Sequence, residues 1–145
     1  MQKRFITMLT CILELSTGRI TYINAGHNAP IFKRSGEKAE LLKKRSGIPI
    51  DSYFSKKKAL GNYCEFELNI TKGDMLVLYT DGITEAMNND SEIFGEQRLL
   101  DLIDLYATSD KNSNEISSYI RRQVLAFANN TTQDDDITLL ILKFN

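Results

Sequence analysis

The sequence contains few of the residues that usually carry nucleophilic or zinc chemistry. Its 145 residues include one histidine, His27, and two cysteines, Cys11 and Cys64, with no Cys-x-x-Cys pair. So few histidines and cysteines exclude a zinc site built from His and Cys ligands. Two cysteines are also too few for a disulfide framework. Both cysteines lie in apolar runs, which predicts two reduced thiols in the core. Because His27 has no apparent catalytic partner, a polar loop role is favoured over that of a general acid.

Long apolar segments and a strong charge of either sign are also absent. No run is long enough to cross a bilayer, and Glu14 interrupts the apolar N-terminal stretch. That stretch is therefore predicted to be a strand of a cytoplasmic protein without membrane contact, rather than a signal peptide. The formal net charge of −1 gives no indication of nucleic-acid binding. No P-loop, Gly-x-Gly-x-x-Gly or Gly-x-Ser-x-Gly motif occurs. The length predicts one domain over residues 1–145.

The hydrophobic pattern changes its period along the chain. Short apolar or alternating runs bounded by turn residues predict strands, several of them in hairpins, at residues 5–15, 20–25, 31–33, 39–42, 64–68 and 75–80. Apolar residues then recur at helical spacing over 99–106 and 116–127, and a last strand-like run covers 137–144. Asn112 and Glu115 have the spacing of a capping box at the second helix. This order predicts an α+β fold with helices packed on antiparallel sheets.

Acidic residues stand at the ends of two of the predicted strands. Asp81 follows the run at 75–80, and Asp134, Asp135 and Asp136 precede the last run. If these strands are neighbours, the carboxylates converge, and carboxylates without His or Cys partners suit Mg²⁺ or Mn²⁺. Gly82 would allow close approach of a ligand or a backbone angle that a side chain forbids. The alternative is an ordinary Asp-Gly turn and a solvated strand start.

Two basic triplets flank one predicted loop. Lys43–Arg45 and Lys56–Lys58 are predicted to be solvated faces. A docking surface for a phosphorylated or acidic partner is the alternative, because arginine and lysine clusters bind such groups.

Four segments occur in an order that resembles a known family. They are residues 22–30 (YINAGHNAP), 78–86 (LYTDGITEA), 94–99 (FGEQRL) and 135–139 (DDITL). The chain is similar to PPM-type metal-dependent Ser/Thr protein phosphatases, in the branch of the bacterial stage II sporulation protein E. The resemblance implies an α-β-β-α sandwich and a site with two Mn²⁺ or Mg²⁺ ions, in which a metal-activated water hydrolyses phosphoserine or phosphothreonine. The implied substrate is a phosphorylated regulatory protein of the anti-sigma-factor antagonist type.

The resemblance also assigns roles to particular residues. It implies that Asp81 and Asp135 are metal ligands, that Gly82 and Asp136 support them, and that Asp134 lies outside the motif. Gly26–Pro30 would form a structural loop, with Ala29 in place of the usual proline. A second loop at 46–51 departs from the family pattern at Asp51, which replaces a glycine.

One part of the family pattern is missing from the sequence. The family's N-terminal portion carries a metal-bridging aspartate on an early strand, and nothing before Phe5 supplies it. The chain therefore resembles the C-terminal two thirds of a catalytic domain that is truncated at its N-terminus. The alternative to an enzyme is an incomplete fragment or pseudophosphatase that acts as a protein-binding or dimerisation module. An exposed sheet edge would then favour a homodimer.

Overall fold

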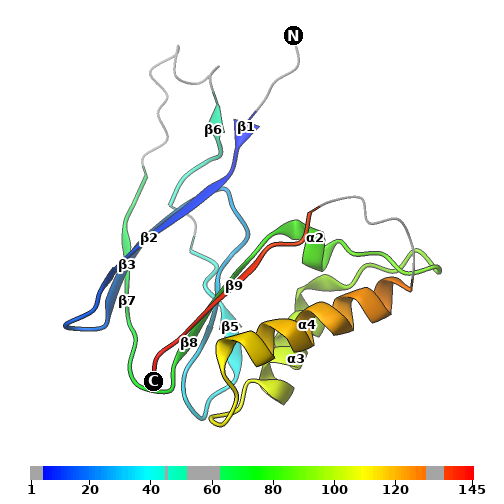
Figure 1. Ribbon diagram of the computed structural model, residues 1–145. Coiled ribbons are helices and arrows are strands. Elements are labelled where there is room, and N and C mark those ends of the chain that lie inside the picture. The colour runs from blue at the N-terminus through cyan, green and yellow to red at the C-terminus, as the bar shows by residue number, and fades with distance from the viewer. Residues whose placement is uncertain (1–4, 45, 52–62, 130–135) are drawn as a thin grey trace. The chain divides into compact units, whose positions relative to one another are not determined.

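The computed structural model describes residues 5–44, 46–51, 63–129 and 136–145 (Figure 1). The chain divides into two compact units. Unit 1 comprises the described residues of Met1–Ala29 and Lys43–Thr71, and unit 2 those of Pro30–Leu42 and Lys72–Asn145.

Unit 1 contains only strands among its described residues. The strands are β1 (Phe5–Ile6), β2 (Met8–Glu14), β3 (Arg19–Ala25), β6 (Ile50–Asp51) and β7 (Phe66–Asn69). One antiparallel sheet has the order β2-β3-β7, and β1 pairs with β6 in a second, two-stranded sheet. The predicted hairpin of residues 5–15 and 20–25 is confirmed, with Cys11 opposite Tyr22.

The hairpin turn of unit 1 depends on a glycine. Gly18 has a φ of +71°, and its N–H donates to the Glu14 carbonyl at 2.8 Å. A Cβ at Gly18 would lie 2.3 Å from the carbonyl oxygen of Ile70, which no side chain tolerates. The turn therefore joins β2 and β3 while the chain beyond β7 packs directly against it.

Unit 2 combines a four-stranded sheet with helices. Its strands are β4 (Ile31–Lys33), β5 (Ala39–Leu41), β8 (Met75–Tyr79) and β9 (Leu139–Lys143), in the antiparallel order β5-β4-β8-β9. Its helices are α2 (Asp81–Thr84), α3 (Gly95–Tyr106) and α4 (Ser113–Ala128). Figure 1 shows α3 and α4 running side by side along this sheet.

The apolar core of unit 2 lies between its sheet and its helices. The strands contribute Ile31, Val77 and Ile141, and the helices contribute residues such as Ile103 and Ile120, at the spacing that the sequence predicted. The predicted capping box is confirmed, because Asn112 and Glu115 exchange hydrogen bonds between side chains and main chain at the start of α4. The predicted α+β class, with antiparallel sheets and flanking helices, is confirmed.

None of the helices in the described part of the chain is long and apolar enough to cross a membrane.

Candidate functional site

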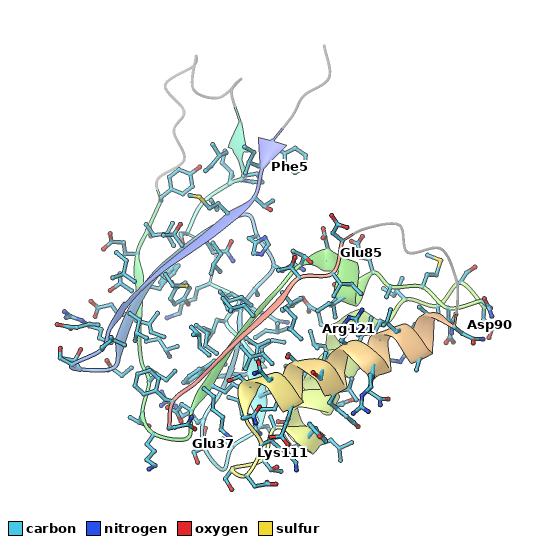
Figure 2. The ribbon with its side chains drawn as sticks, viewed as in Figure 1. Phe5, Glu37, Glu85, Asp90, Lys111 and Arg121 are labelled. Carbon is cyan, nitrogen blue, oxygen red and sulfur yellow. The ribbon has the colours of Figure 1, made fainter. Side chains whose placement is uncertain are left out.

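The predicted acidic site lies at one end of the sheet of unit 2. Strands β8 and β9 are antiparallel neighbours, and their last pair at this end is Tyr79 opposite Leu139. Asp81 lies two residues after Tyr79, and Asp136 lies three residues before Leu139. The condition for convergence, that the two strands be neighbours, is therefore met. Figure 2 shows Glu85, at the end of α2, on the same side of the sheet as the start of β9.

Asp81 is the first residue of a single helical turn. The turn is closed by the Glu85 N–H, which donates to the Asp81 carbonyl at 2.7 Å, and by the Thr84 hydroxyl at 3.3 Å. The side chain of Asp81 is exposed, and its carboxylate has no hydrogen-bond or ion-pair partner among the described residues. The carboxylate is consequently available to a ligand.

The expected Asp-Gly turn is thus a short helix, and one of the two roles considered for Gly82 is wrong. Gly82 is buried and helical, and the described glycines with positive φ do not include it. A helical φ is open to every residue, so a forbidden backbone angle does not explain this glycine. Close approach of a ligand stays a prediction.

Thr80 connects the two strand ends through its side chain. Its hydroxyl donates to the Asp136 carbonyl at 2.9 Å and accepts from the Thr138 N–H at 2.9 Å. The Thr80 N–H also donates to the Thr138 carbonyl at 3.1 Å. We call these three hydrogen bonds the Thr80 clip. It extends the β8–β9 pairing beyond the last strand residues, and no local sequence pattern predicted it.

The described residues supply only part of a metal site. Asp134 and Asp135 lie outside them, and Asp136 is exposed. Within the described ranges no group of three or more His, Cys, Asp or Glu side chains could hold an ion. The unpaired Asp81 carboxylate and the nearby acidic segment nevertheless fit a hard cation, because their donors are oxygens and no imidazole or thiol competes.

A buried tyrosine next to the site was not predicted as special. Tyr79 is 2% exposed, and its hydroxyl makes no hydrogen bond of good geometry among the described residues, the nearby Glu96 carboxylate included. Burial, and to a lesser extent the negative charge of Glu96, raises the pKa of Tyr79 above its usual value. A buried hydroxyl without a partner is destabilising. The short apolar run predicted a buried strand here, but it did not predict that the Tyr79 hydroxyl would have no partner.

His27 belongs to a hydrogen-bonded loop in unit 1. Its N–H donates to the Asn24 side-chain oxygen at 2.8 Å, and the Asn24 amide group donates to the His27 carbonyl at 3.1 Å. Asn24 is 1% exposed, and its own N–H donates to the buried Ser46 hydroxyl at 2.6 Å. Within the described ranges the imidazole makes one hydrogen bond, with the Thr7 hydroxyl at 3.3 Å. This geometry accords with a structural loop at Gly26–Pro30.

The two cysteines were predicted to be core thiols, and this place is wrong for one of them. Burial raises the pKa of Cys11, which is half-buried in β2, whereas Cys64 is exposed just before β7. Of the basic triplets, Lys43 and Lys44 are exposed, and Arg45 and Lys56–Lys58 lie outside the described residues.

Three comparisons place this arrangement among known proteins. The family model described as Stage II sporulation protein E (SpoIIE) matches residues 1–145. Protein IcfG of Synechocystis sp. is 29% identical over 141 residues, which are 97% of this chain and 21% of IcfG.

Among solved structures, the RsbU and RsbW domains of Rv1364c from Mycobacterium tuberculosis match 93% of this chain and 36% of that chain, with a TM-score of 0.71 and 22% identity. The phosphatase domain of the cell fate determinant SpoIIE from Bacillus subtilis, presoaked in manganese, matches 96% of this chain and 56% of that chain, with a TM-score of 0.69 and 16% identity. These two structures share the fold of this chain. The chain spans about a fifth of IcfG, about a third of the Rv1364c chain and little more than half of the SpoIIE phosphatase domain.

Proposed function

Because the chain belongs to the stage II sporulation protein E family over its whole length, we propose that it forms part of a metal-dependent Ser/Thr phosphoprotein phosphatase domain. The proposed ligands are Asp81 and Asp135, supported by Gly82 and Asp136. The observation that carries the proposal is the β8–β9 pairing, which brings Asp81 and Asp136 to the same end of one sheet. The manganese-presoaked crystal of a similar domain supports Mn²⁺ or Mg²⁺ as the ion.

The chain's own residues hold and orient the oxygen ligands. Asp81 offers a carboxylate without a competing partner in the described residues, from a turn that the backbone of Glu85 closes. The Thr80 clip keeps the segment that carries Asp136 against this turn. A divalent ion held there would supply a bound water of lowered pKa and offset the negative charge of the phosphoryl oxygens. For the complete domain we propose two such ions.

The proposed substrate is a phosphorylated regulatory protein of the anti-sigma-factor antagonist type, and the proposed location is the cytoplasm. Both follow from the family resemblance, which implies a nucleophile supplied by water. Hydrolysis by water needs no nucleophilic serine or cysteine at the site.

The proposal is tested by Mn²⁺-dependent hydrolysis of p-nitrophenyl phosphate by the chain and by its Asp81→Asn variant. We expect turnover that requires Mn²⁺ and falls at least 100-fold on substitution, because a neutral amide binds a divalent cation far more weakly than a carboxylate. Asp90→Asn is the matched control, since Asp90 lies at the tip of the segment leading away from Glu85 (Figure 2). Absence both of turnover and of Mn²⁺ binding in calorimetry would overturn the assignment of a working site.

The alternative function is a protein-binding or dimerisation module, and one observation favours it. Strand β2 is an edge strand with a single charged residue, Glu14, and its neighbourhood exposes Phe5 (64%), Ile12 (69%) and Leu15 (81%). An edge with so little charge and with exposed apolar side chains favours pairing with another strand. Light scattering tests this: Ile12→Lys should convert a dimer to a monomer, whereas Leu105→Lys, on an exposed face of α3, should not. A monomeric wild-type chain at high concentration would refute the homodimer.

A further inference from the structure

Thr80 occupies the N-cap position of α2, where a threonine side chain usually stabilises its own helix. It immediately precedes α2, with extended backbone angles (φ −93°, ψ 160°), as an N-cap residue does. A threonine there usually accepts a hydrogen bond from the second or third N–H of its own helix. The Thr80 side chain makes no such bond. Instead it bonds to Asp136 and Thr138, 56 and 58 residues along the chain. The hydroxyl is therefore used to join two segments rather than to stabilise its own helix.

The Thr80 hydroxyl bonds only to main-chain groups of the acidic segment and to none of the carboxylates. It uses the carbonyl of Asp136 and the N–H of Thr138, whereas Asp81 is the next residue after Thr80. Two acidic segments are consequently held together although their carboxylates repel each other in the absence of a cation. Because Mg²⁺ and Mn²⁺ require narrowly defined ligand positions, groups that orient ligands affect affinity strongly.

We propose that the Thr80 hydroxyl is a positioning group for the metal site: it holds the main chain at Asp136 close to Asp81 and thereby sets the affinity for a divalent cation. The inference rests on the proposed function, because it assumes that Asp81 and Asp135 bind an ion. It adds a residue that touches neither the ion nor the substrate and acts through the main chain of the acidic segment.

The test compares Thr80→Val, which removes the hydroxyl at nearly constant volume, with Thr80→Ser, which keeps it. Mn²⁺ alone is the probe, and its affinity is measured from the broadening of amide NMR signals around Asp81. We expect Thr80→Val to weaken Mn²⁺ binding by about 10- to 100-fold, as loss of a ligand-orienting partner does, and Thr80→Ser by less than about 3-fold. Hydrogen exchange at the Thr138 amide should accelerate in Thr80→Val alone.

Ser46→Ala is the matched control for lost stability. The Ser46 hydroxyl also joins two distant segments, through the Asn24 N–H, but in unit 1. It should lower stability without changing Mn²⁺ affinity. If Thr80→Val binds Mn²⁺ as the wild type does while Asp81→Asn does not, the positioning role is wrong and the metal site stands. If the wild type binds no Mn²⁺, the proposed function fails and this inference falls with it. Unchanged exchange at Thr138 would overturn the clip itself, whatever the metal does.

Discussion

The two units differ in how they bury apolar side chains. Among the described residues, unit 2 contains fourteen of the eighteen buried hydrophobic residues, because α3 and α4 cover its sheet. The described part of unit 1 contains only four, yet it has eight of the thirteen exposed large hydrophobic residues. Its described interior is organised instead by the polar network of Asn24. The packed helices of unit 2 can hold the strand end at Asp81 in a fixed geometry. The exposed apolar side chains of unit 1 provide the surface for the homodimer considered above.

The largest expected effect is a contrast between two isoleucines on strands. Ile31 in β4 of unit 2 is 0% exposed, and Ile12 in β2 of unit 1 is 69% exposed. Ile31→Ala should lower the free energy of unfolding by about 2–5 kcal/mol, because it leaves a cavity in a packed core. Ile12→Ala should change it by at most about 1 kcal/mol, the range of strand propensity. Urea denaturation measures both, and equal losses would contradict the contrast between the units.

A lysine of β9 provides the next test. The Lys143 ammonium donates to the carbonyls of Thr108, Ser109 and Lys111 beyond the end of α3, which has no basic residue in its last turn. Lys143→Met should cost about 2 kcal/mol, because charge-assisted hydrogen bonds and a cation near a helix C-terminus are both lost. Thermal unfolding should show a clear decrease in melting temperature.

Lys44→Met in unit 1 is the control for Lys143→Met. Lys44 is exposed, and its ammonium lies 5.6 Å from the centre of the Phe66 ring. Loss of an exposed cation–π contact should cost no more than about 1 kcal/mol. If the two substitutions lower the stability equally, the hydrogen bonds of Lys143 do not stabilise unit 2 as expected.

Short-range and long-range contacts differ in how well the sequence predicts them. Hairpins, amphipathic helices and the capping box of Asn112 were predicted because each depends on residues within a few positions of one another. The Lys143 and Thr80 contacts were not predicted, because they join residues 32 to 58 positions apart through polar groups that leave no periodic signal. The acidic site was predicted from the carboxylates at two strand ends and from the motifs of the family. The helical turn at Asp81 was missed because Asp-Gly is more typical of a β-turn.

The polar network of unit 1 predicts an effect of similar size to that of Lys143. Asn24→Ala should lower stability by about 1–3 kcal/mol, because the His27 N–H and two carbonyls lose their partner in a buried place. Hydrogen exchange should accelerate at the His27 amide and remain unchanged in the helices of unit 2. Asn69→Ala, at an exposed position of β7, is the matched control and should have little effect. Acceleration confined to unit 2 would contradict the assignment.

The smallest expected effect is an increase in stability. Tyr79→Phe removes the partnerless buried hydroxyl of unit 2 and should raise stability by up to about 1 kcal/mol at pH 8. Because the pKa of Tyr79 is raised in the folded state, the unfolded chain loses this proton first, near its ordinary pKa of about 10. Stability therefore falls as pH rises above that value, and the phenylalanine variant should lose less. Its advantage should consequently be larger at pH 11 than at pH 8. The control, Tyr22→Phe in unit 1, should change stability at pH 8 by less than about 0.5 kcal/mol. If Tyr79→Phe lowers stability instead, the Tyr79 hydroxyl has a stabilising partner.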